Sequence, residues 1–216
     1  MFFPYKDDNP RVLFPIVTYG IIAINIFIFL LQFYISGISL DSYERIIFNF
    51  GFVPNKFEIL NIFSSMFMHG GFLHLIGNMW FLYIFGDNVE SILGHLRFLY
   101  FYIFCGIGAT LTQFIINPSS SIPMIGASGA VAGVLGAYMI KFPKAKVHVF
   151  AFIFIFVTTF VVPAQIVLGI WFIMQLSGGL NTLGIDTTGG VAWFAHIGGF
   201  IWGIGSLKKF QTFSFR

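Results

Sequence analysis

Two residues set among glycines in apolar stretches could carry chemistry in this chain of 216 residues. Ser128 lies in a Gly-Ala-Ser-Gly run that begins at residue 126, and His196 lies in an Ala-His-Ile-Gly-Gly run that begins at residue 195. A serine hydroxyl is a weak nucleophile that needs an adjacent base, and an imidazole supplies one near neutral pH. We therefore predict that Ser128 is a nucleophile and His196 its general base. The competing interpretation is structural, with a serine bonded to its own helix and a histidine that links two helices.

A third polar cluster supplies hydrogen-bond donors. His74 and Asn78 are four residues apart, so they share one face of a helix. Attack on a carbonyl creates an oxyanion, and donors aimed at it stabilise the transition state by about 3–4 kcal/mol each. We predict that His74 and Asn78 stabilise this oxyanion. Taken alone, the pair is more typical of polar contacts that hold two membrane helices together.

The elements that position these residues are membrane helices. The chain is 57% apolar and 9% charged, whereas soluble domains carry about 25% charged residues. A spanning segment must satisfy its backbone internally, and the strict alternation of a membrane barrel is absent from the sequence. The predicted fold class is an all-α polytopic membrane protein. Its six expected spans lie at 12–35, 71–89, 97–116, 126–140, 163–178 and 192–207.

Glycines four residues apart predict which helices meet. Gly129 and Gly133 follow Ser128, and Gly199 and Gly203 follow His196. Such small-residue faces let helix backbones approach closely, so a short serine side chain could reach the imidazole. The segment 147–162 is apolar enough to span, but a full span there would put His196 at the opposite membrane face from Ser128. We therefore expect it to be an interfacial or obliquely entering stretch.

Basic residues indicate the orientation of the spans. With six spans, Arg45 and Lys56 lie on one side, together with the loops 117–125 and 179–191. The other side holds Lys6, Arg11, Arg97, Lys141, Lys144, Lys146, Lys208, Lys209 and Arg216. We expect both termini to be cytoplasmic and the site to open on the opposite side.

Taken together, these motifs resemble those of the rhomboid family of intramembrane serine proteases. The resemblance covers roughly residues 12–208. Its matching elements are His69, the run 74–78, the runs around Ser128 and His196, Glu90 to Gly94, and Leu168 to Phe172.

The resemblance implies a six-helix core with a water-accessible cavity, a Ser128–His196 dyad, and an oxyanion bound by the Ser128 amide, His74 and Asn78. It implies transmembrane protein substrates, admitted laterally at the fifth helix and the loop 179–191, and no cofactor. One departure concerns Ala132, because many family members carry an aromatic residue one turn after the serine, against the catalytic histidine. We expect an aromatic side chain from a neighbouring helix to replace it.

We therefore expect an intramembrane serine endopeptidase that lacks a carboxylate third member, since Asp87 and Glu90 lie at the other end of their helix and Asp186 lies in a loop. The expected organisation is a short cytoplasmic segment 1–11, a membrane domain 12–208 and a cytoplasmic tail 209–216. We expect a multi-pass protein of the plasma (inner) membrane that binds lipid and membrane-protein substrates, with no nucleic acid and no metal. The alternatives are an inactive rhomboid-like protein that binds membrane clients, and a transporter or channel, which would favour mid-membrane charges or internal repeats.

Overall fold

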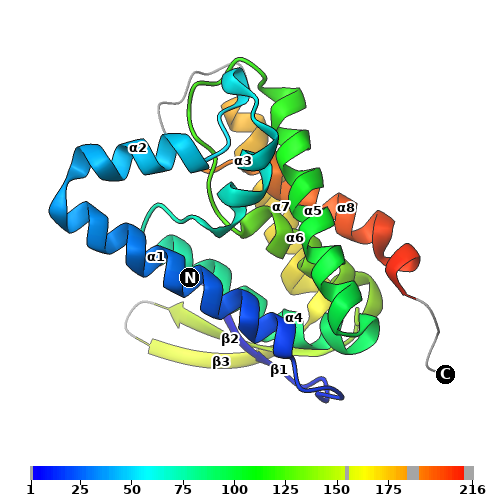
Figure 1. The fold of residues 1–216 in the computed structure, drawn as a ribbon. Helices are drawn as coiled ribbons and strands as arrows, with labels where there is room; N and C mark the ends of the chain where they lie inside the picture. Colours follow the sequence, from blue (N-terminus) through cyan, green and yellow to red (C-terminus); the bar gives the residue numbers. More distant parts are fainter. Residues whose placement is uncertain (1, 154–155, 184–189, 212–216) are drawn as a thin grey trace.

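The computed structural model describes residues 2–153, 156–183 and 190–211. Long helices make up most of this part of the chain, and a small antiparallel sheet lies at one end of the molecule (Figure 1). The long helices are α1 (Ile16–Ile38), α4 (Phe72–Leu93), α5 (His95–Ile116), α6 (Ser128–Lys141), α7 (Ala164–Thr182) and α8 (Trp193–Phe210).

Helix α6 lies at the centre of the bundle, in contact with α4, α5, α7 and α8. It has only 14 residues, and every residue from Gly129 to Tyr138 is buried. Glycine and alanine fill most of its first two turns, so neighbouring helices can approach its backbone from several sides. The residue at its start, Ser128, is consequently held by a densely packed element.

The prediction of a helical polytopic membrane protein is confirmed. Each of the six expected spans coincides with one long helix of the described chain. By length and composition α1, α5 and α7 could cross a membrane, and a fourth span arises if 59–67 and α4 are counted as one span bent by 88°. Helix α6 is apolar but shorter.

The long connection between α1 and α4 is largely helical. It contains α2 (Leu40–Phe50), α3 (Ile59–Ser64) and two short 3₁₀ turns, η1 (Pro54–Lys56) and η2 (Ser65–Phe67). The Ser39 hydroxyl accepts a hydrogen bond from the Ser42 amide and thereby caps α2. No residue of α2 is buried, and the helix extends away from the bundle (Figure 1).

The sheet was not predicted from the sequence. Strand β2 (Lys146–Ile153) pairs with β3 (Phe156–Pro163), and β1 (Phe2–Asp7) pairs with the other edge of β2, all antiparallel. The segment 147–162, expected to be an interfacial or obliquely entering stretch, forms two paired strands, with residues 154–155 outside the description. A short, continuous apolar run is compatible with a strand and with a helical segment, so its composition alone did not predict the hairpin.

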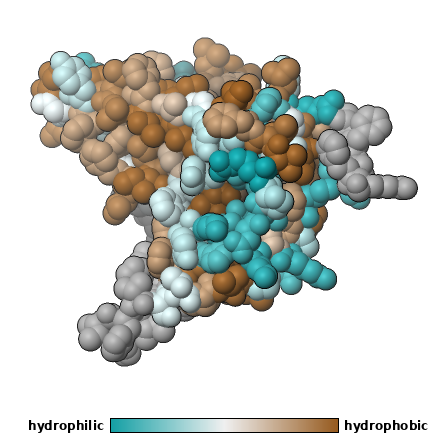
Figure 2. Space-filling view, turned by 90° about the horizontal axis from the view of Figure 1, so that it is seen from below, coloured by the Kyte–Doolittle hydropathy of each residue, from teal (hydrophilic) through white to brown (hydrophobic). Residues whose placement is uncertain are grey.

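A cluster of charged and polar residues lies at the end of the bundle near the sheet, and we call it the sheet-side cluster: Asp7, Arg11, Asp87, Glu90 and Tyr138. Arg11 Nε donates to Asp87 Oδ2 at 3.0 Å, and Tyr138 donates to Asp7. Viewed from this end, hydrophilic residues gather on the surface (Figure 2). As the sequence predicted, Asp87 and Glu90 lie far along α4 from His74.

Glu90 is the fully buried carboxylate of this cluster, with no exposed surface. Its carboxylate accepts from the amides of Val17 and Thr18 at 2.9 and 2.8 Å, from the Thr18 hydroxyl at 2.7 Å and from His95 Nδ1 at 2.5 Å. The Val17 and Thr18 amides belong to the first turn of α1, where amides lack helical partners. Glu90 therefore caps α1 from a different helix.

Candidate active site

Ser128 begins α6, directly after a tight approach of the chain to α4. Gly126 has φ +127°, and a Cβ there would lie 2.7 Å from His74 Nε2, so only glycine fits. The Gly126 amide donates to the carbonyl of Ser65 at 2.9 Å, which anchors the loop before α6. This geometry brings the serine and His74 to the same place.

His196 lies in the first turn of α8, on the side that packs against α6. A Cβ added to Gly199 would lie 2.0 Å from the Gly129 carbonyl oxygen, and one on Gly203 would lie 2.1 Å from that of Gly133. The two glycine faces predicted from the sequence therefore do meet, backbone against backbone. Their contact holds the starts of α6 and α8 side by side.

His74 and Asn78 lie in the first two turns of α4, on the face towards α6. Asn78 is only 8% exposed, and its Nδ2 has no hydrogen-bond partner among the described residues. The ring of His74 packs edge-on against His69, with 5.1 Å between the centroids. A buried donor without a partner destabilises the fold unless a ligand binds to it. Asn78 Nδ2 is therefore available to donate to a ligand oxygen.

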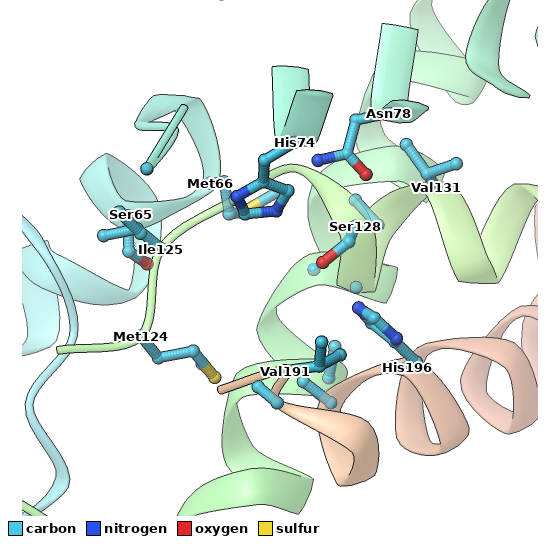
Figure 3. Close-up of a pocket in the computed structure, with 18 of the residues that line it drawn as sticks. Ser65, Met66, His74, Asn78, Met124, Ile125, Ser128, Val131, Val191 and His196 are labelled. Carbon is cyan, nitrogen blue, oxygen red and sulfur yellow. The ribbon is translucent and has the colours of Figure 1, made fainter. Parts of the chain in front are cut away.

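One cavity of about 650 Å³ is lined by all four predicted residues, His74, Asn78, Ser128 and His196. Figure 3 shows the Ser128 hydroxyl between the His74 and His196 rings, with the Asn78 amide above it. No hydrogen bond joins Ser128 to His196 in the part of the chain that the structure describes. Such catalytic hydrogen bonds are often long without substrate and shorten when it binds.

The surroundings of the His196 ring contain residues that the sequence analysis did not assign. Nδ1 of His196 lies 2.7 Å from Oε1 of Gln175 on α7. The Trp171 ring, also on α7, lies 6.0 Å from the imidazole between centroids, and Trp193 approaches it edge-on at 6.4 Å. The expectation of an aromatic from a neighbouring helix in place of Ala132 is met by Trp171. Gln175 was missed, although a glutamine within an apolar span was a signal for a polar contact there.

The remaining predictions concern acidic and metal-binding residues. Asp186, which the sequence analysis set aside, lies outside the described residues, as does Arg216. No group of three His, Cys, Asp or Glu side chains that could hold a metal ion occurs within 2–153, 156–183 and 190–211.

Comparison with known sequences identifies the family. The rhomboid domain matches residues 56–208, which include the three motifs that line the cavity. The chain belongs to the rhomboid family. Its relatives include a rhomboid protease, GluP of Bacillus subtilis (strain 168), which is 33% identical over 129 residues, 58% of this chain and 24% of that protein.

Two further relatives of this rhomboid protein carry mitochondrial names. Rhomboid protein 1, mitochondrial, of Saccharomyces cerevisiae is 29% identical over 208 residues, 94% of this chain and 54% of the yeast protein. Presenilin-associated rhomboid-like protein A, mitochondrial, of Danio rerio is 31% identical over 97 residues, 44% of this chain and 25% of the fish protein. The match thus spans about half or less of the length of these three relatives.

Proposed function

We propose that this rhomboid protein is a serine endopeptidase that cuts transmembrane segments of membrane proteins, with Ser128 and His196 as a catalytic dyad. The observation that carries the proposal is the shared cavity, which joins a hydroxyl, an imidazole and an unpaired amide donor from three different helices. In an apolar bundle such a group of polar side chains is costly unless it serves a function.

In the first step His196 Nε2 takes the Ser128 proton while Oγ attacks the scissile carbonyl carbon. The carbonyl oxygen becomes an oxyanion, for which Asn78 Nδ2, the His74 ring and the Ser128 amide are the donors. Ser128 is the first residue of α6, so its amide lies at the positive end of the helix dipole. The tetrahedral intermediate then expels the amine, which receives the proton from His196.

The second step hydrolyses the acyl-enzyme. Water attacks the Ser128 ester, His196 accepts its proton, and the carboxyl product leaves as Oγ regains a proton. Water must therefore reach a site among apolar helices. A cavity of about 650 Å³, whose lining includes the loop residues Pro123, Met124 and Val191, supplies the volume for water and for an unfolded stretch of substrate.

The proposed substrates are proteins whose transmembrane segment unwinds into this cavity. The proposed topology places both termini in the cytoplasm of a cell with a plasma (inner) membrane and the site on the opposite side. Supporting it, Lys6, Lys141 and Lys146 lie in or beside the elements of the sheet end, whereas Ser128 begins α6 at its other end.

The decisive experiment reconstitutes the full chain in lipid vesicles with a model single-span substrate. Wild type is expected to cleave it, Ser128→Ala to lose all cleavage, and Ser121→Ala, which alters an exposed serine in the preceding loop, to behave as wild type. Cleavage by the Ser128→Ala variant would overturn the proposal. Substrate that binds to the wild type without being cut would instead favour an inactive, client-binding rhomboid.

A further inference from the structure

The His196 imidazole has a fixed partner on the side away from the cavity. Its Nδ1 lies 2.7 Å from Gln175 Oε1, and Gln175 is only 6% exposed. Gln175 comes from the middle of α7, whereas His196 lies in the first turn of α8, so the contact links two helices. Among the described residues no carboxylate is hydrogen-bonded to either side chain, so the interaction is one between an amide and an imidazole ring.

The direction of this hydrogen bond follows from the second contact of the amide. Gln175 Nε2 donates to the carbonyl oxygen of Trp171, one turn earlier, at 3.2 Å. The reversed amide would set its oxygen against that carbonyl oxygen, so Nε2 faces Trp171 and Oε1 faces the ring. An amide oxygen only accepts, and Nδ1 must therefore carry the hydrogen.

A hydrogen on Nδ1 leaves the lone pair on Nε2. In Figure 3 the His196 ring extends towards Ser128, which is the direction from which a base must accept the hydroxyl proton. The other tautomer would present an N–H to the serine and could not accept its proton. In serine proteases with a carboxylate, the wrong tautomer lowers kcat by about 10⁴-fold.

The same turn of α7 also supports the face of the ring. The Trp171 ring is tilted by 33° to the imidazole, with 6.0 Å between centroids. Ala132, which follows Ser128 by one turn of α6, is fully buried but too small to reach across to the ring. Trp171 and Gln175 thus restrict the imidazole from its face and from its Nδ1 edge.

We propose that Gln175 is a positioning residue that selects the Nδ1–H tautomer of His196, in the place that a carboxylate takes in a triad, with Trp171 fixing the plane of the ring. This inference rests on the proposed protease function. It adds a neutral third member to the dyad, and it assigns that member to α7.

The test compares three full-length variants in vesicles with the same single-span substrate. Gln175→Met keeps the length and apolar contacts but removes the acceptor, so kcat is expected to fall by about 10- to 1,000-fold with KM unchanged. Gln175→Glu retains an acceptor oxygen and is expected to recover most of the activity. Gln165→Met alters an exposed glutamine of the same helix and should leave both constants as in wild type.

A second readout does not depend on cleavage. In the Ser128→Ala background, ¹⁵N spectra of histidine-labelled protein are expected to report His196 as the Nδ1–H tautomer, and Gln175→Met is expected to produce a mixture. Wild-type kcat together with an unchanged tautomer in Gln175→Met would overturn this inference and leave the protease proposal intact. A wild type that does not cleave would refute the protease function, while the spectra would still decide the role of Gln175.

Discussion

Two polar clusters share the helices α4 and α6 in this protein and differ in how their groups are paired. The cluster around the cavity, which we call the cavity cluster, contains His74, Asn78, Ser128 and His196. Helix α4 contributes His74 and Asn78 to it and Asp87 and Glu90 to the sheet-side cluster. Helix α6 likewise contributes Ser128 at its start and Tyr138 near its end.

The difference lies in the partners of the buried groups. Glu90 accepts four hydrogen bonds, and Asp87 is bonded to Arg11, so these carboxylates have their partners within the chain. Asn78 Nδ2 has no partner among the described residues and lies beside a cavity. A paired cluster stabilises the fold, whereas an unpaired donor next to open volume is poised for a ligand. The four predictions that follow test this division.

The largest effect is expected from Gly199→Ala, because it disturbs the helix pair on which the cavity cluster depends. The new Cβ would lie 2.0 Å from the Gly129 carbonyl oxygen, so α6 and α8 must separate. We expect a loss of about 3 kcal/mol or more in the free energy of unfolding, together with loss of cleavage. The measurement is reversible unfolding in mixed micelles, followed by circular dichroism.

Its matched control is Gly205→Ala in the same helix, where nothing lies within 4 Å of the added Cβ. That variant should be as stable as wild type or slightly more so, since alanine favours helix over glycine. Equal stability of the two variants would show that the glycine contact between α6 and α8 does not position the site.

Asn78→Ala tests the cavity cluster alone. Removing one oxyanion donor is expected to lower kcat by about 10²- to 10³-fold with a small change in KM. Stability should be unchanged, because the Nδ2 group that is lost has no partner in the described chain. Cleavage kinetics and micelle unfolding would be measured on the same preparation, and a destabilised but fully active variant would reverse the assignment.

Glu90→Gln tests the sheet-side cluster in the same way. The amide keeps one acceptor oxygen but loses the charge that caps α1 and pairs with His95, so we expect a loss of about 2–3 kcal/mol of stability. The kcat of the remaining folded protein should equal that of wild type. Glu58→Gln, at an exposed residue before α3, serves as the control.

The smallest effect concerns Asp7 and pH. Burial raises the pKa of Asp7 to about 6, and this outweighs the opposite effect of the hydrogen bond from Tyr138. The folded state therefore binds the proton more tightly than the unfolded chain, and stability is lost as the pH rises from about 4 to about 6. Because Asp7 is partly exposed, the expected loss is about 1 kcal/mol.

Asp7→Asn should abolish this loss of stability with rising pH, as measured by unfolding between pH 4 and 7. Asp8→Asn provides the contrast, since hydrogen bonding to His148 lowers the pKa of Asp8 and its contribution is lost as the pH falls. If the stability of Asp7→Asn still falls as the pH rises from about 4 to about 6, another group of the sheet-side cluster is the origin of the effect.

The sequence contained most of what defines the cavity cluster. Glycines four residues apart predicted the contact of α6 with α8, and the spacing of His74 and Asn78 predicted their common face. These features are local and periodic, so they can be recognised without a structure. The membrane helices were predictable for the same reason, from the length of their apolar runs.

The features that the sequence did not reveal depend on contacts between distant segments. Gln175 and His196 are separated by 21 residues, and a glutamine in an apolar helix does not indicate which ring it faces. The hairpin of β2 and β3 was hidden because an apolar run of that length fits a strand or a membrane segment equally well. Its pairing with β1 joins residues 140 or more positions apart.

That pairing has a consequence for biogenesis. During synthesis, Phe2–Asp7 leaves the ribosome well before Lys146–Ile153 exists, so the first strand stays unpaired while α1, α4, α5 and α6 are synthesised. Closing so long a loop is entropically costly, and contacts of this kind form late in folding. Completion of the sheet, with Asp7 then bonded to Tyr138, is therefore expected to act as a closing step that follows insertion of the first helices.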